Sequence, residues 1–232
     1  YNIMSAVDDA LRMPDPKTTL EGTLTLATSH TVLGYFLPHH LQRFEQRHPK
    51  VKVKVHEVSR EGIEEGLVNG LYDMGVLLTS NAVVEDLALE TFFRSQRRLW
   101  LPAKHPMIGN VDVTLADVAK EPYIMLTVDE AELTSLKYWS HTPYLPNISL
   151  RTSSVEAVRS MVANGQGITI LPDAVYRPWS LEGKRIETIN LKDNVPTMNI
   201  GLGWSRTREH TPVMQVFRDY FQQLFFDQIT GK

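Results

Sequence analysis

The sequence predicts an α/β protein built from two units in which strands and helices alternate. Strand patterns at 23–28 and 51–58 flank a helical stripe, which is typical of a strand-helix-strand unit. A loop-rich stretch at 102–109 then interrupts the pattern, and a second series of strands and helices follows it. These observations favour two α/β units.

Hydrophobic periodicity predicts the elements of the first unit. Apolar residues alternate at 23–28 and 51–58, as expected for strands. The helical stripe between them tolerates Pro38 in its first turn. A helix at 60–69 and a buried-type strand at 74–78 continue a parallel arrangement. The residues of the stripe are Leu33, Phe36, Leu37, Leu41 and Phe44.

The second unit shows the same alternation and ends with a return to the first. Strands are expected before the break at 87–93 and 97–101. Beyond the break, the pattern predicts a strand at 123–126, a helix at 131–139, a strand at 148–151, a helix at 155–164 and a strand at 168–171. A strand at 197–204 precedes an amphipathic closing helix. We expect the chain to cross between units near Leu101 and Trp204.

Composition and charge exclude several classes of protein. The chain has 232 residues, 42% hydrophobic and 22% charged, which is ordinary globular composition and enough for one large or two smaller domains. No apolar run reaches the roughly 20 residues of a membrane span. Cysteine is absent, which excludes disulfides and thiolate metal sites. The net charge of −3 argues against DNA binding by this part alone. Because the chain begins with Tyr1, we expect an upstream segment to have been removed.

Hydroxyl residues follow one strand in each unit, at 26–31 and 150–155. Helix N-termini present unpaired N–H groups and a partial positive charge, so two such places facing across a cleft can hold a carboxylate. Plain N-capping is the alternative explanation, because Ser and Thr are usual capping residues. The sequence leaves both interpretations open.

Four segments resemble the effector-binding domain of LysR-type transcriptional regulators. The stretch 22–26 leads through Ser29 to Leu37-Pro38 and on to His48-Pro49-Lys50-Val51, and 67–76 resembles the family's glycine- and aspartate-containing segment. The most specific match is 162–172, where the glycine spacing, strand and proline fall in the family's order. Trp204 ends a late strand before the closing helix, as a return hinge does in the family.

The resemblance implies a type 2 periplasmic-binding-protein-like fold with two subdomains and an effector cleft between them. Residues 1–19 would be the end of a linker helix and a connector, and 20–101 with 204–232 would form subdomain I. Subdomain II would be 102–203. The resemblance further implies a homodimer or tetramer in the cytoplasm, paired through the helix near Leu33 and the helix at 155–164. DNA would be bound only through a helix-turn-helix ahead of Tyr1. The stretch 127–148 matches no family pattern.

The resemblance also places the effector contacts, which we expect to receive a small organic acid or another anion. The expected residues are Ser29, His30, Thr31, Arg60, Thr79, Thr127, Thr152, Ser153 and Ser154. Arg60 opens a helix, where a cation opposes the helix dipole unless an anion offsets it. That anion is either the effector or a surface partner among Glu57, Glu61 and Glu64. His30 is either a contact or a partly exposed packing residue.

Catalytic and metal-binding patterns are absent from the sequence. It has no phosphate loop, no nucleophile elbow and no His-Glu-x-x-His pair, so an enzyme, a cofactor and a metal are not expected. We interpret His39-His40 as surface residues, and the acidic runs Glu64-Glu65 and 129–132 as solvated faces. Two other functions share the fold and remain open: a solute-binding protein of a membrane transporter, and an enzyme on the same two-lobed scaffold. A linker helix before the first strand favours the regulator.

Overall fold

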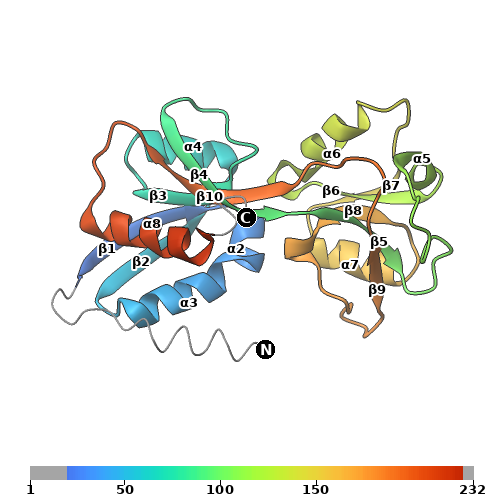
Figure 1. Cartoon of the computed structure of the whole chain (residues 1–232), viewed down its shortest axis with the longest axis horizontal. Helices are drawn as coiled ribbons and strands as arrows, with labels where there is room; N and C mark the ends of the chain where they lie inside the picture. Colours follow the sequence, from blue (N-terminus) through green and yellow to red (C-terminus); the bar gives the residue numbers. More distant parts are fainter. Residues whose placement is uncertain (1–19, 227–232) are drawn as a thin grey trace.

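The computed structural model describes residues 20–226, which form two lobes placed side by side (Figure 1). The linker helix predicted within residues 1–19 lies outside the described residues. Lobe I contains β1 (Gly22–Thr28), α2 (His30–Tyr35), α3 (Leu37–Arg47), β2 (Val51–Glu57), α4 (Arg60–Val68), β3 (Met74–Leu78), β4 (Leu87–Ser95), β10 (Met198–Ser205) and α8 (Pro212–Leu224). Lobe II contains β5 (Arg97–Pro102), α5 (Leu115–Val118), β6 (Pro122–Leu126), η1 (Val128–Glu130), α6 (Ala131–Trp139), β7 (Asn147–Thr152), α7 (Val155–Ala163), β8 (Thr169–Pro172), η2 (Asp173–Val175) and β9 (Ile186–Ile189).

Lobe I is a five-stranded sheet with helices on both faces. The strand order is β2-β1-β3-β10-β4, in which β1 runs parallel to β2 and β3, and β10 runs antiparallel to its neighbours. Leu24 and Leu26 of β1 pack with α3 and α8, whereas Ala27 packs with α4. Successive side chains of a strand point to opposite faces, so one strand supports both layers.

The helical stripe predicted from Leu33 to Phe44 forms two helices instead of one. Helix α2 ends at Phe36, whose backbone (φ −124°, ψ −55°) leaves the helical region, and α3 starts with Pro38 in its first turn. Proline lacks an N–H and clashes with a preceding helical turn, so the chain restarts the helix there. His40 is also less exposed than predicted: it packs against Phe36 with ring centroids 4.5 Å apart, and burial lowers its pKa to about 4.

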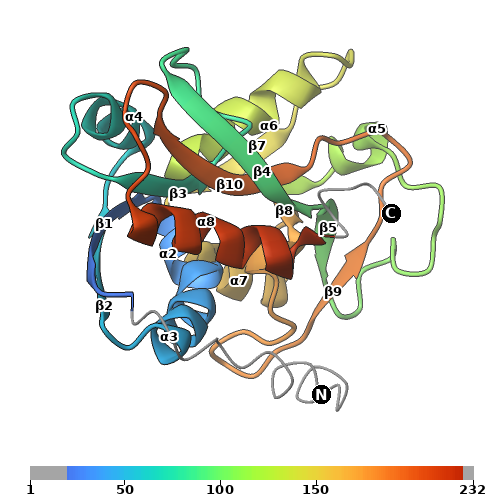
Figure 2. The ribbon, with the colours of Figure 1, turned by 60° about the vertical axis from the view of Figure 1, so that its left-hand side comes forward.

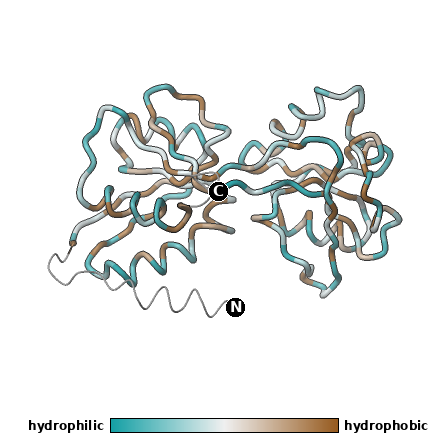
Figure 3. Tube along the Cα trace, in the orientation of Figure 1, coloured by the Kyte–Doolittle hydropathy of each residue, from teal (hydrophilic) through white to brown (hydrophobic). Residues whose placement is uncertain are grey.

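Lobe II joins two short sheets across one glycine. The strands β8-β5-β9 are antiparallel, β6 and β7 are parallel, and a parallel bridge between Tyr123 and Ile168 links the two sheets. A Cβ atom at Gly167 would lie 2.7 Å from the carbonyl oxygen of Pro122. The close approach therefore requires glycine, which explains the glycine spacing seen in the sequence. Separate apolar clusters, one around Trp139 and one around Trp100, pack against these joined sheets. Brown segments mark apolar strands in both lobes (Figure 3).

The chain crosses between the lobes twice, and Figure 2 shows β4, β5 and β10 near these crossings. Strand β4 pairs with β10 in lobe I, while β5 pairs with β8 and β9 in lobe II, so the first crossing is at Gln96. The second lies between Ile189 and Met198. Both precede the positions near 101 and 204 that the sequence suggested. The loop signal at 102–109 lies inside lobe II, because the strands continue across the crossings without turn residues.

Candidate ligand-binding site

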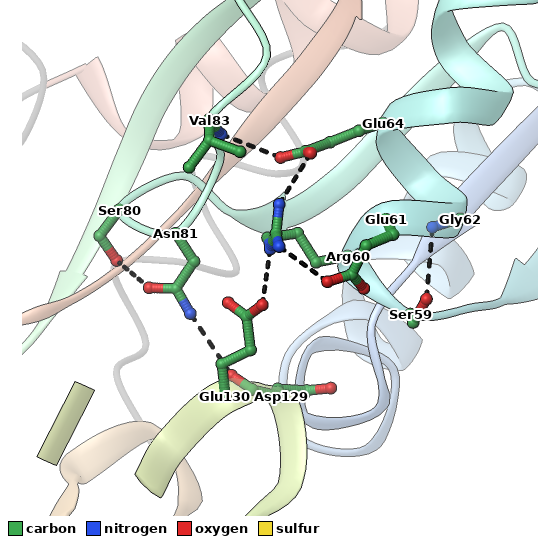
Figure 4. Close-up of polar contacts among 10 residues, drawn as sticks. All are labelled: Ser59, Arg60, Glu61, Gly62, Glu64, Ser80, Asn81, Val83, Asp129 and Glu130. Carbon is green, nitrogen blue, oxygen red and sulfur yellow. Dashed lines mark hydrogen bonds and ion pairs between the residues drawn. The ribbon is translucent and has the colours of Figure 1, made fainter. Parts of the chain in front are cut away.

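Polar groups from opposite lobes meet at one edge of the cleft. The backbone N–H of Thr31, in the first turn of α2, donates to Oδ2 of Asp129 at 2.6 Å. Arg60 Nε donates to Oε1 of Glu130 at 2.6 Å, and Asn81 Nδ2 lies 3.4 Å from the backbone oxygen of Asp129. Figure 4 shows Arg60 between the carboxylates of α4 and those of the turn η1. Lobe II therefore presents two acidic side chains to the helix starts of lobe I.

Asp129 and Glu130 adopt left-handed backbone conformations, with φ of 49° and 61°. Such conformations cost non-glycine residues about 1 kcal/mol or more, and aspartate tolerates them better than most residues. The cross-lobe hydrogen bonds offset this cost. The sequence predicts a solvated face for the acidic run at 129–132, and for these two residues that prediction is wrong, because both make hydrogen bonds across the cleft.

Arg60 is surrounded by carboxylates. Besides Glu130, it donates to Glu64 at 2.8 Å and to Glu61 at 2.7 Å. Glu64 is only 3% exposed, against our expectation of a solvated residue, and its other oxygen accepts the backbone N–H of Val83 at 3.0 Å. The hydrogen bond to Glu130 is the main reason that the pKa of Arg60 lies above its ordinary value. The positive charge of Arg60 is thus neutralised by groups of the chain itself.

An outer cavity of about 340 Å³ opens beside these residues. Ser29, Arg60 and Leu133 are among the residues that line it, together with Asp129 and Glu130. Ser29 is the N-cap of α2 and is 5% exposed, and its hydroxyl has no hydrogen-bond partner within residues 20–226. The expected anion position at the start of α2 is therefore taken by Asp129, while the capping hydroxyl stays unused.

The remaining predicted residues lie around the cleft but line neither the outer cavity nor the inner one described next. His30 pairs with Glu57 at 2.8 Å on the surface, and Thr79 bonds to the hydroxyl of Thr91 at 2.6 Å. The backbone N–H of Thr127 donates a hydrogen bond to the backbone oxygen of Thr152 at 2.9 Å, at the ends of β6 and β7. Ser153 follows β7, and Ser154 caps α7 by accepting the N–H of Ala157 at 3.1 Å.

A second, inner chamber of about 40 Å³ lies between the lobes next to the crossing strands. Its lining includes Thr31 from lobe I, Arg97 at the start of β5, Met198 at the start of β10, and Tyr123 and Tyr138 from lobe II. Sequence reasoning missed Arg97, Met198, Tyr123 and Tyr138. The first three lie at or near the start of a predicted strand and Tyr138 lies in a predicted helix, so none of them stood out as a ligand contact. Asn81, Leu78 and Asp129 line both cavities, so the two spaces share a wall.

The two lobes are also tied on another side of α2. Tyr35 donates its hydroxyl to Glu156 of α7 at 3.1 Å, and Glu156 in turn accepts from Arg159. Within residues 20–226, no group of three or more His, Cys, Asp or Glu residues is arranged to hold a metal ion. No helix in that same range is long and apolar enough to span a bilayer. The arrangement suits reversible binding of a small polar molecule between two lobes.

Fold and cavities together define a two-lobed ligand-binding domain, and comparison with known proteins identifies its family. Residues 17–225 match the LysR substrate binding domain, so the chain belongs to that family. It is 27% identical over 170 residues to the HTH-type transcriptional regulator CysB of Burkholderia cenocepacia, covering 72% of this chain and 53% of that protein. It is 25% identical over 226 residues to YwqM of Bacillus subtilis, an uncharacterized HTH-type transcriptional regulator, covering 96% of this chain and 76% of that one.

Solved structures show the same fold. HinK, a LysR family transcriptional regulator from Pseudomonas aeruginosa, superposes with a TM-score of 0.81 at 23% identity, over 96% of this chain and 74% of its own. The regulatory domain of Synechocystis CcmR in complex with 2-PG gives a TM-score of 0.77 at 20% identity, over 88% of this chain and 98% of its own. The chain spans about half the length of the first curated relatives it matches. The predicted type 2 periplasmic-binding-protein-like fold is confirmed.

Proposed function

We propose that the chain is the effector-sensing part of a bacterial LysR-type transcriptional regulator and binds a small organic acid in the cleft. The observation that carries the proposal is that two cavities, the outer and the inner one, lie between the lobes and are each lined by residues of both lobes. The family match supports it, because the relatives reported above are transcriptional regulators. These relatives favour a regulator over the alternatives of a transporter's solute receptor and an enzyme.

Related structures support a small, acidic effector. The effector-binding domain of QuiR was solved in complex with shikimate and matches with a TM-score of 0.72 at 17% identity, over 90% of this chain and 99% of its own. CcmR was solved with 2-PG. For this chain we propose an anionic effector of similar size. We further propose a cytoplasmic protein, a homodimer or tetramer paired through α2–α3 and α7, and DNA binding through a segment ahead of Tyr1.

We propose that the lobes act as two subdomains that move about Gln96 and residues 190–197. The contacts of Asp129 with Thr31 and of Glu130 with Arg60 would then hold the lobes together. Ser29, Thr31 and Arg60 lie at the cavities and are proposed effector contacts. His30, Thr79, Thr127, Thr152, Ser153 and Ser154 lie further out and are proposed to contribute only if the cleft opens.

Arg60 keeps a role in this proposal despite its carboxylate partners. A guanidinium has five N–H donors, and three are used by Glu61, Glu64 and Glu130. The other two have no acceptor in the part of the chain that the structure describes, and we propose that they bond a polar group of the effector in the outer cavity. In this proposal, Arg60 orients the effector through hydrogen bonds and contributes little net positive charge to its binding.

A thermal-shift screen of small organic acids tests the proposed function. A ligand that binds only the folded state raises the free energy of unfolding by about 2.7 kcal/mol at a hundredfold excess over Kd. We expect at least one acid to stabilise the chain in a saturable way, and calorimetry to give one site per chain. A screen in which metabolite acids give no saturable shift, while DNA or a membrane vesicle does, contradicts the proposal.

A further inference from the structure

Arg97 and Arg60 both line the cleft cavities, and among the described residues Arg97 has no acidic partner. Its Nη1 donates to the backbone oxygen of Pro196, and among residues 20–226 no carboxylate lies within ion-pair distance of it. The next residue, Arg98, pairs with Asp173 at 2.6 Å, and Arg60 has three carboxylates. Burial lowers the pKa of Arg97, with the nearby phenols of Tyr138 and Tyr123 acting in the opposite direction. Arg97 is partly buried, and a partly desolvated cation without a counter-ion attracts an anion.

A hydroxyl proton is also free beside Arg97. Ser135 donates to Tyr138 Oη at 2.9 Å, and the backbone N–H of Ile170 donates to Tyr123 Oη at 3.2 Å. Both phenol oxygens act as acceptors in these two bonds, and no hydrogen bond of the described residues uses either O–H proton. Even where one phenol donates to the other, the proton of the second phenol has no acceptor among the described residues. Since both phenols line the inner chamber, that proton is available to a ligand oxygen.

The inner chamber limits what this pair of donors can hold. A water molecule needs about 10 to 15 Å³ of such volume, so about 40 Å³ accommodates roughly three waters or one compact group. Met125, Leu171 and Met198 provide apolar walls. Asp129 also lines the chamber, but its carboxylate is held by the N–H of Thr31 at 2.6 Å. A flat carboxylate on an apolar carbon fits this combination of size, charge and walls.

We propose that the inner chamber is the anion subsite of the cleft and binds the carboxylate of the effector through Arg97 and the free hydroxyl proton of the Tyr123–Tyr138 pair. This inference rests on the proposed function and deepens it, because it places the acid at Arg97 and away from Arg60. At Arg60, the carboxylates of Glu61, Glu64 and Glu130 already occupy the position of an acid. The effector's polar remainder then extends toward the outer cavity, which shares Asn81 and Leu78 with the chamber.

Formate and acetate are suitable probes, because they carry the carboxylate with almost nothing attached. Thermal unfolding of the chain is followed in increasing sodium acetate, with sodium chloride lowered to keep ionic strength constant, so that screening does not change. We expect a saturable rise in Tm for the parent protein. Arg97→Gln should weaken the apparent affinity about 30-fold or more, because a charged hydrogen-bonding partner is lost. The matched control Arg94→Gln removes an exposed arginine from β4 and should bind acetate as the parent does.

Two further variants keep the test decisive if Arg97→Gln does not fold. Tyr138→Phe removes one hydroxyl and should weaken acetate about 5-fold, while Arg97→Lys should retain part of the affinity. Equal acetate shifts in the parent and in Arg97→Gln, or no saturable shift in the parent, overturn the subsite. A screening hit that binds both proteins equally keeps the proposed function and rejects this inference. An acetate shift that depends on Arg97, when none of the larger metabolite acids in the screen gives a saturable shift, keeps the subsite and rejects the proposed effector-sensing function.

Discussion

Two arginines face the same cleft in opposite electrostatic situations. Arg60, in the first turn of α4, is enclosed by carboxylates from both lobes, whereas Arg97, at the start of β5, donates to a carbonyl oxygen and has no carboxylate of residues 20–226 within ion-pair distance. Arg60 therefore links the two lobes through ion pairs, whereas Arg97 can still bind an anion. Position beside a cavity is thus a weaker guide to ligand binding than the balance of charge around the residue.

Truncating the two arginines should affect stability very differently, and this is the largest expected effect. Arg60→Met leaves buried Glu64 without its cation and should lower the free energy of unfolding by about 3 kcal/mol. Arg97→Met removes a cation without a carboxylate partner and should change that free energy by less than about 1 kcal/mol. Urea unfolding of both variants measures the difference. Similar losses in both would remove the distinction between the two sites.

Removing the carboxylate of Asp129 should loosen the cleft. Asp129→Ala loses the charge-assisted bond to the N–H of Thr31 and should lower the free energy of unfolding by about 1.5 kcal/mol. Small-angle X-ray scattering should show a larger radius of gyration without ligand. Glu132→Ala is the control, since it breaks an ion pair with Arg151 inside lobe II and should leave the radius unchanged. An unchanged radius in both variants would mean that Asp129 does not hold the lobes together.

Arg60 should matter less than Arg97 for the affinity of an acidic effector. Because its charge is neutralised by Glu61, Glu64 and Glu130, Arg60→Gln loses hydrogen bonds to the effector and little attraction. We expect an affinity loss of about 1 kcal/mol in calorimetry, or about fivefold. If Arg60→Gln weakens the acid more than Arg97→Gln does, the two roles are reversed.

The pH dependence offers the smallest and most specific effect. Burial is the main reason that the pKa of Tyr138 lies well above 10, with Tyr123 adding to it. The folded protein therefore keeps the Tyr138 proton at a pH where the unfolded chain loses it, so stability declines as pH rises above about 10. Acetate affinity should stay constant between pH 6 and 9. Chemical unfolding at pH 9 and 11 should show a smaller decline in the free energy of unfolding for Tyr138→Phe than for the parent. An equal decline would indicate that the Tyr138 hydroxyl is exposed to water in the folded protein.

The fold was largely predictable because its signals are local. Alternation at 23–28, and the glycine spacing before β8, gave the order of strands and helices and the resemblance to the family. The positions at which the chain crosses between the lobes were harder to predict from the sequence. Strand β4 meets β5 at Gln96 and β10 starts at Met198, and neither place has a turn signal. The division of the long helical stripe at Phe36 was hidden for a related reason, since its apolar residues continue the same face.

The candidate site was predictable only in lobe I. Arg60 and Ser29 attract notice because their positions at helix starts can be judged from neighbouring residues. Asp129 is invisible to such reasoning, since its importance comes from a bond to Thr31, far away in the sequence. Arg97 opens a strand between Gln96 and Arg98, and only the folded chain shows that no carboxylate of residues 20–226 pairs with it. The charges that folding brings around a residue leave no local pattern in the sequence. The proposed acid-binding end of the cleft could therefore be found only from the structure.

A crystal structure of the chain with an acid from the thermal-shift screen is the most direct test of the central claim. We predict that the ligand lies between the lobes, with its carboxylate within hydrogen-bond distance of Arg97 and of Tyr123 or Tyr138. Glu130 would remain bound to Arg60. A ligand outside the cleft, or one whose carboxylate displaces Glu130 from Arg60 and leaves the inner chamber empty, would contradict the account.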